Sequence, residues 1–116
     1  MHNLKQLKIW SRSVDLATQV YEATANFPKE ERYGLTSQIR RSAVSIPSNV
    51  AEGAGRNTPK QFGYFLEIAN GSSYELQTQL IISNRLKLLD DKTVEPLLKE
   101  IDELQKMNYK LQVSIK

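Results

Sequence analysis

The apolar residues of this chain recur at spacings of three and four, which is the period of an amphipathic helix. In the first segment they form two adjacent stripes, which consist of Leu7, Trp10, Val14, Ala17 and Tyr21 and of Ile9, Leu16, Val20, Ala23 and Phe27. Two stripes side by side make an apolar face wider than one neighbouring helix covers. The helix is predicted to end at Phe27, because a residue that precedes a proline is pushed out of the α region.

A second helix is predicted from Leu35 to Val50, with Pro47 inside it. An internal proline removes one backbone hydrogen bond and clashes with the preceding turn. We therefore expect a kink at Pro47, or a full break there. When the chain folds back after this helix, Gly53 is expected to lie near Gly63, and two small residues at one level let two helices approach closely.

The sequence Thr58-Pro59-Lys60-Gln61 is a strong start signal for a third helix, because Thr58 can cap it and Pro59 suits its first position. This helix is predicted to run to about Leu89. Its apolar positions form one stripe of Phe62, Leu66, Ala69, Leu76 and Leu80 and a second of Phe65, Ile68, Ile82, Leu86 and Leu89.

Asp90 and Asp91 can cap a fourth helix, where their negative charge suits the positive end of the helix dipole. Pro96 is expected in its first turn, where proline is tolerated. Strand-like alternation is absent from the sequence. The sequence therefore predicts an all-α, antiparallel, up-down-up-down four-helix bundle that forms a single domain over residues 1–116.

Apolar runs in the sequence fall short of the roughly 20 residues that a membrane-spanning helix needs. The N-terminal residues lack the apolar segment of a signal peptide. We therefore expect a cytoplasmic protein without a membrane partner.

Few residues of this chain suit catalysis or metal binding. It has no cysteine, and His2 is its only histidine. Zinc-thiolate sites, cysteine nucleophiles and the Glu-x-x-His pairs of di-iron bundles are therefore excluded. We expect no catalytic residue, no metal and no cofactor, and a protein that is not an enzyme.

One carboxylate interrupts an apolar stripe of the third helix. Extending that stripe leads to Glu75 and Gln79, and burying an unpaired carboxylate is costly. The fold-back places Arg40 or Arg41 level with Glu75. One hypothesis is a buried or half-buried structural pair of Glu75 with one of these arginines, supported by Gln79. The alternative is a glutamate that faces solvent or a subunit interface.

The charge of the chain is uneven. The net charge is +3, and residues 1–60 hold nine Lys or Arg against five Asp or Glu. A surface of this kind can face a polyanion. The candidate phosphate-binding residues are Lys8, Arg12, Arg41, Arg56 and Lys60. For each of them, the alternative is an ordinary solvated charge.

Most aromatic residues fall at core spacing, including Trp10 and Tyr21. Four tyrosines lie off the main stripes and suit either a subunit interface or stacking on bases: Tyr33, Tyr64, Tyr74 and Tyr109.

The segment RYGLTSQIRRSAVSIPSNVAEGAGR, residues 32–56, resembles the bacterial four-helix bundle protein family, first noticed as reading frames in intervening sequences of large-subunit rRNA genes. The most specific part is SIPSNVAEG, residues 45–53. Similarity extends over nearly the whole chain and includes the segments 7–10, 27–31, 62–66, 71–72 and 75–80.

This resemblance implies a four-helix bundle that assembles into a ring-shaped homopentamer. The family is similar to the accessory protein of diversity-generating retroelements, a basic ring that binds nucleic acid and a reverse transcriptase. Five chains of net charge +3 would carry about +15.

Two functions follow as hypotheses. The first is a non-catalytic homopentamer that binds structured RNA through phosphate contacts. The second is a scaffold that docks a protein partner without binding RNA. The sequence leaves open which helix faces form the subunit interface.

Overall fold

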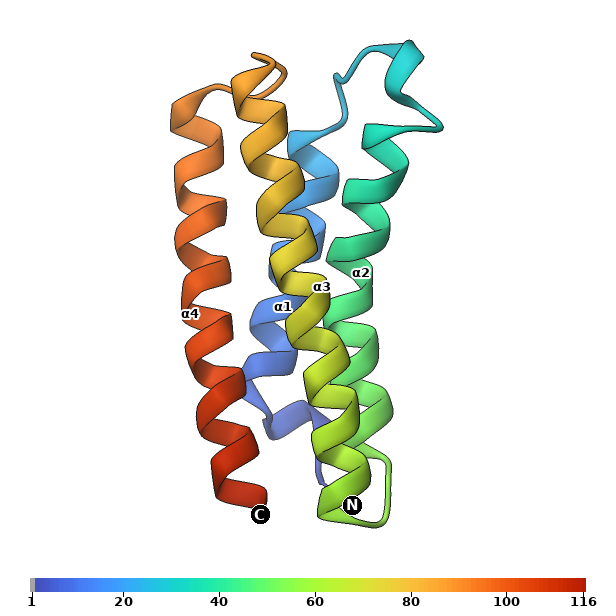
Figure 1. Ribbon diagram of the computed structural model, residues 1–116, viewed down its shortest axis with the longest axis vertical. Coiled ribbons are helices and arrows are strands. Elements are labelled where there is room, and N and C mark those ends of the chain that lie inside the picture. Colours follow the sequence, from blue (N-terminus) through green and yellow to red (C-terminus); the bar gives the residue numbers. More distant parts are fainter. Residues whose placement is uncertain (1) are drawn as a thin grey trace.

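The computed structural model describes residues 2–116, which fold into four long antiparallel helices (Figure 1). These helices are α1 (Lys8–Ala23), α2 (Leu35–Ala54), α3 (Pro59–Arg85) and α4 (Asp91–Ile115). Two short 3-10 helices, η1 (Leu4–Gln6) and η2 (Lys29–Glu31), precede α1 and α2. Helix α1 packs on α2 and α4, and α3 packs on the same two neighbours. The described residues contain no strand, and the predicted all-α four-helix bundle is confirmed.

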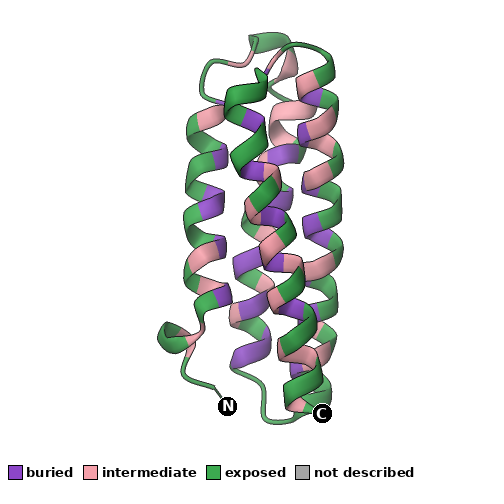
Figure 2. Cartoon of the chain, turned by 90° about the vertical axis from the view of Figure 1, so that its left-hand side faces the viewer, coloured by how far each residue is buried: buried purple, intermediate pink, exposed green. Residues whose placement is uncertain are grey.

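Buried residues line the inward face of each helix (Figure 2). In α1 the core stripe is the one that contains Ile9, Leu16 and Val20, all of which are buried. The prediction that Tyr21 belongs to the core was wrong, because its side chain is exposed, as is that of Val14 on the same stripe. The second α3 stripe also points largely outward. Each second stripe is thus divided, because Ala17 and Leu89 are buried in the core while other members of the stripes are exposed.

Both predicted helix starts are confirmed by their caps. The Thr58 hydroxyl accepts a hydrogen bond from the Gln61 N–H at 3.1 Å, and Pro59 is the first residue of α3. The Asp90 carboxylate accepts from the Thr93 N–H at 2.8 Å. Hydrogen bonding to Thr93 favours the charged carboxylate and holds the pKa of Asp90 below its usual value.

Helix α1 ends at Ala23 rather than at Phe27. The carbonyls of its last turn have other partners. The Thr24 hydroxyl donates to the Val20 carbonyl at 2.9 Å, and Arg40 donates from Nη2 to the Tyr21 carbonyl at 3.2 Å. A cationic side chain on the last carbonyls stabilises a helix C-terminus. A residue on α2 thus helps to set where α1 stops.

Helix α3 ends at Arg85 instead of near Leu89, because Lys87 adopts the left-handed conformation with φ of 63°. The Lys87 N–H then bonds to the Asn84 carbonyl, and the Leu88 N–H bonds to the Ser83 carbonyl at 2.9 Å. This pairing is a Schellman motif. The left-handed residue of this motif is usually glycine. Because a lysine occupies the position here, the sequence does not indicate that the helix ends at this point.

Two helices contain an internal proline, Pro47 in α2 and Pro96 in α4. Helix α2 continues through Pro47 without a break, and the kink expected there stays a prediction. Pro96 was expected in the first turn of α4. It is the sixth residue of that helix and so lies beyond the first turn.

Candidate nucleic-acid interface

The five predicted phosphate-binding residues do not form one surface. Lys8 and Arg12 lie in the first turns of α1, while Arg56 and Lys60 flank the turn between α2 and α3. Arg41 lies 15 residues before Arg56 along the chain, which corresponds to about 22 Å along a helix. Any phosphate-binding site must therefore be built from some of these residues and from others that the sequence did not single out.

Arg12 has a protein partner. Its Nε lies 2.9 Å from Oε2 of Glu100 on α4, and its Nη2 contacts the other carboxylate oxygen of Glu100. This two-point ion pair raises the pKa of Arg12. The pair fastens α1 to α4, and a phosphate contact by Arg12 stays a prediction.

Arg56 also has partners, although its side chain remains partly exposed. Its Nη2 lies 3.5 Å from Oε2 of Glu52, one helical turn away. Its guanidinium carbon lies 4.8 Å from the ring centroid of Phe65. An exposed pair at this spacing contributes about 0.3–0.5 kcal/mol, so Arg56 can exchange Glu52 for a stronger anion.

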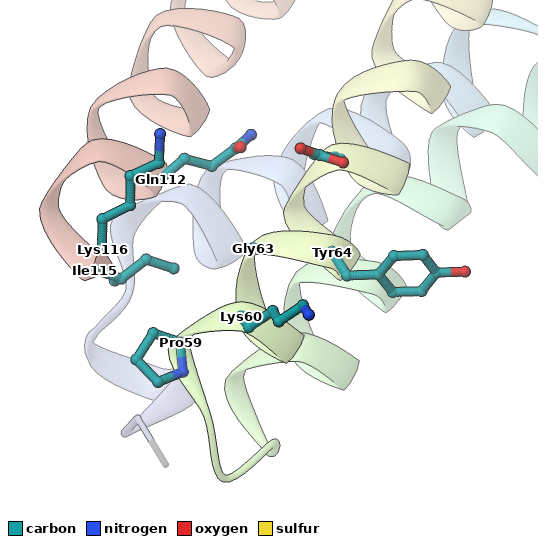
Figure 3. Close-up of a pocket in the computed structure, with 8 residues that line it drawn as sticks. Pro59, Lys60, Gly63, Tyr64, Gln112, Ile115 and Lys116 are labelled. Carbon is teal, nitrogen blue, oxygen red and sulfur yellow. The ribbon is translucent and has the colours of Figure 1, made fainter.

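Lys60 lies at a groove between the start of α3 and the end of α4 (Figure 3). The groove has a volume of about 530 Å³. Lys60 and Lys116 share it with the carboxylate of Glu67. At Gly63 the groove is open, since a Cβ placed there would meet no atom of the described residues within 4 Å. One acid against two lysines makes this groove a weak anion site.

The proposed structural pair of Glu75 with Arg40 or Arg41 was wrong. Its register was nearly right, because Ser45 and Ser72 hydrogen-bond across α2 and α3 at 2.8 Å. However, Arg40 turns toward α1, and Glu75 is exposed with no cation within 4.0 Å among residues 2–116. The Oε1 atom of Gln79 is buried without a hydrogen-bond partner in the described residues. The alternative, a glutamate facing solvent or an interface, fits this geometry.

A second groove gathers the arginines at the opposite end of α2. We refer to it as the arginine groove; its volume is about 450 Å³. It is lined by three arginines, two tyrosines and two hydroxyl residues, namely Tyr21, Arg32, Tyr33, Thr36, Ser37, Arg40 and Arg41. Glu30 and Glu31 are close in sequence, but no carboxylate lines the groove or lies within 4.0 Å of its arginines in residues 2–116.

Arg40 is held rigidly in this groove. Its Nε donates to the Thr24 hydroxyl at 3.0 Å, its Nη2 donates to the Tyr21 carbonyl, and its guanidinium lies 4.5 Å from the Tyr21 ring centroid. A guanidinium has five N–H donors, so these two bonds leave others available to a ligand. Arg32 lies over the neighbouring ring, with its guanidinium carbon 5.9 Å from the Tyr33 centroid.

The groove also includes the first turn of α2. Its N-cap residue, Gly34, provides no side-chain cap, and the first intrahelical bond is from the Gln38 N–H to the Gly34 carbonyl. The N–H groups of the first turn therefore remain available to an anion. Thr36, on the same turn, has a buried hydroxyl oxygen with no hydrogen-bond partner in the described residues. Unpartnered donors beside three arginines favour an anionic ligand.

Of the five predicted cations, only Arg41 lies in the arginine groove. The sequence reading missed Arg32, assigned Arg40 to a structural pair and assigned Tyr21 to the core. One signal was present, since Arg32-Tyr33 precedes Arg40-Arg41 by only eight residues. In residues 2–116 there is also no cluster of acids and histidine that suits a metal ion. In the same residues, no helix is long and apolar enough to cross a membrane.

Comparison with known proteins gives a family and a fold. The family described as 23S rRNA-intervening sequence protein matches residues 5–110. A crystal structure of a protein with unknown function from the S23 ribosomal protein family of Bacteroides thetaiotaomicron superposes with a TM-score of 0.81. That protein is 20% identical, and the similarity covers 90% of this chain and 97% of the other. Among curated proteins, none matches significantly.

Proposed function

This chain belongs to the 23S rRNA-intervening sequence protein family, and we propose that it is a non-catalytic, homo-oligomeric protein that binds structured RNA through phosphate contacts. The single observation that carries the proposal is the arginine groove, where three guanidinium groups converge with no carboxylate among the lining residues. Guanidinium forks match the geometry of phosphate oxygens and bind them by two parallel hydrogen bonds.

The remaining candidate cations have a weaker role in this proposal. Lys8 and Lys60 are exposed at the other end of the bundle and have no ion-pair partner within 4.0 Å in residues 2–116. They add to the positive potential that attracts RNA from a distance. Contacts of this kind position a nucleic acid without reading its sequence.

The test of RNA binding is its salt dependence. We expect the protein to bind a folded RNA hairpin at low salt and to lose affinity steeply as salt rises, with a log–log slope of about −0.7 to −0.9 for each phosphate contact. Fluorescence anisotropy of a labelled hairpin over a series of salt concentrations measures this slope. Binding that is absent at low salt would contradict the proposal.

We propose self-association because two apolar surfaces of this chain are exposed. The first is a groove between α1 and α2 with a volume of about 300 Å³, lined mainly by Val14, Tyr21, Val44 and Pro47. The second is the outer face of α3. Its exposed apolar residues lie four or fourteen positions apart and so share one side of the helix: Tyr64, Ile68, Ile82 and Leu86.

A second copy of the chain is the occupant that these surfaces favour, because the groove can receive the α3 ridge of a neighbour. Such a contact joins two different surfaces, and heterologous contacts close into rings when the rotation between subunits allows it. Glu75 lies seven residues from both Ile68 and Ile82, so it would face this interface. A homopentameric ring, the assembly that the family resemblance implies, is our proposal for the closed form.

The proposed interface predicts that a charged substitution in the α3 ridge lowers the mass of the assembly in solution. Ile82→Asp replaces a large apolar side chain of the ridge with a carboxylate, which removes apolar contact area and adds a charge that must lose its water on assembly. We expect wild-type protein to elute as five chains of 13.3 kDa and the variant to elute as smaller species, as measured by light scattering after size exclusion. Val113→Asp, on an exposed part of α4, is the matched control and should keep the wild-type mass. Equal masses for all three proteins would contradict this interface.

The same apolar surfaces favour the second candidate function, a scaffold for a protein partner without RNA binding. The two functions differ in one observable. A scaffold would keep its assembly state but show no salt-sensitive retention of RNA in the hairpin experiment.

A further inference from the structure

The aromatic residues of the arginine groove point to a more specific ligand than phosphate alone. Tyr33 is 90% exposed, although it lies on the loop between η2 and α2 and beside the groove. Tyr21, on the α1 wall, is 43% exposed. Each tyrosine has an arginine of the groove near its ring, Arg32 for Tyr33 and Arg40 for Tyr21.

We propose that the arginine groove binds an unpaired nucleotide of a single-stranded RNA segment. The phosphate would be held by Arg32, Arg40 and Arg41, and the base would stack on Tyr33. This inference rests on the proposed RNA-binding function and deepens it by naming the form of RNA that is recognised.

The proposed phosphate position follows from Arg40 and from the first turn of α2, which both border the arginine groove. Arg40 is fixed by Thr24 and by the Tyr21 carbonyl, so its remaining N–H groups are held in place before a ligand arrives. Within residues 2–116 no side-chain hydrogen bond caps the first turn of α2, although Oε1 of Glu31 lies 3.6 Å from the position that a Cβ of Gly34 would take. A volume of about 450 Å³ lies in the range of pockets that hold small ligands.

The base position follows from Tyr33. In a duplex the bases are stacked on each other and their faces are hidden, whereas an unpaired base can turn out and stack on an aromatic side chain. A ring that is almost fully exposed beside a phosphate site is placed to accept such a base. Arginine guanidinium planes beside the rings provide a second surface for stacking.

The first experiment compares two RNA forms and three proteins. The probes are a labelled oligoadenylate and a blunt RNA duplex with the same strand length, titrated at one low salt concentration. Tyr33→Ala is expected to weaken oligoadenylate binding by roughly five- to one-hundred-fold, since one stacked base contributes that much affinity. Tyr33→Phe keeps the ring and should bind like wild type. Duplex affinity should be the same for all three proteins.

Three outcomes would overturn the inference. These are an unchanged oligoadenylate affinity for Tyr33→Ala, an equal loss of duplex affinity for Tyr33→Ala, and a loss for Tyr33→Phe as large as that for Tyr33→Ala. If salt-dependent binding of both RNAs survives in these cases, phosphate binding stands and only the base-stacking assignment fails. If wild-type protein binds neither RNA at low salt, the proposed function itself fails.

A spectroscopic readout reports stacking directly. Trp10 is the only tryptophan, so Trp10→Phe removes the background and Tyr33→Trp in that protein introduces one reporter at the groove. We expect its fluorescence to be quenched by oligoadenylate and unchanged by the duplex. A Tyr109→Trp reporter, at an exposed position on α4, is the matched control and should respond to neither RNA. Equal quenching of both reporters would contradict stacking at Tyr33.

Discussion

Replacing Arg32 and Arg41 together by glutamine is expected to weaken RNA binding about ten- to one-hundred-fold at low salt. Both side chains line the arginine groove, and neither has an ion-pair partner within 4.0 Å in the described residues. Losing two partly exposed, charged hydrogen bonds to phosphate weakens the binding free energy by about 1.5–3 kcal/mol. The log–log salt slope should become shallower by about 1.4, because each contact to a single strand contributes about 0.7.

Arg40 is left unchanged in this experiment because it also supports the fold. It donates to the Thr24 hydroxyl and to the last-turn carbonyl of Tyr21, so its removal would alter the end of α1. Arg32 and Arg41 are exposed, and glutamine keeps a polar side chain at both positions. The double variant should therefore keep the wild-type helix content and thermal midpoint.

A matched control separates the effect of the arginine groove on RNA affinity from the effect of net charge. Lys92→Gln with Lys99→Gln removes two positive charges from exposed positions on α4 and so gives the same net charge as the groove variant. We expect it to lose only a few-fold in affinity. Equal losses for the two double variants would show that RNA responds to total charge and not to the arginine groove. Anisotropy titrations over several salt concentrations make this comparison.

The helices of this protein could be predicted from sequence because their signals are local. Apolar residues at spacings of three and four, a Thr-Pro start and an Asp cap each act within a few residues. Two helix ends could not be predicted, because their causes are not local or not typical. Arg40 on α2 satisfies the end of α1, and Lys87 takes a conformation that usually requires glycine.

The candidate site was only partly predictable, for a reason that concerns helix faces. Adjacent residues on a helix differ in direction by about 100°, so Arg40 and Arg41 cannot both face the same neighbour. The predicted position of Glu75 along the bundle axis was nearly right. However, the sequence does not show that Thr24 and the Tyr21 carbonyl are the partners of Arg40. The arginine groove arises from this choice of face, together with a loop that brings Arg32 and Tyr33 beside α2.

Gly53 shows the same difference between the position of a residue along the helix axis, which the sequence predicts, and the direction in which it faces, which it does not. It was expected to lie near Gly63, and its neighbours are indeed at that level of α3. However, a Cβ at Gly53 would lie 2.9 Å from Cδ1 of Phe62, 2.9 Å from Cβ of Phe65 and 3.2 Å from the Phe62 carbonyl oxygen. Gly63 faces another direction, and a Cβ built on it has no atom of residues 2–116 within 4 Å. The close approach of α2 and α3 thus depends on one glycine and two phenylalanines.

Gly53→Leu is accordingly expected to lower the free energy of unfolding by about 3 kcal/mol or more. Overpacking a filled core costs about 1–3 kcal/mol, and here one contact is a backbone oxygen that cannot rotate away. Gly53→Ala should lose about 1 kcal/mol, because its single carbon still clashes while alanine regains up to about 1 kcal/mol of helix propensity. Urea unfolding followed by circular dichroism measures both changes at one protein concentration, since assembly makes stability concentration-dependent.

Gly63→Ala is the matched control, because it makes the same chemical change inside a helix where the added carbon meets nothing. It should raise the free energy of unfolding by about 0.5–1 kcal/mol, the propensity gain alone. The two alanine variants are therefore expected to differ in sign. If Gly53→Ala also stabilised the protein, the two helices would have room for a side chain at that position, and the close approach of α2 to α3 would not depend on glycine. A stabilised Gly53→Leu would exclude this packing altogether.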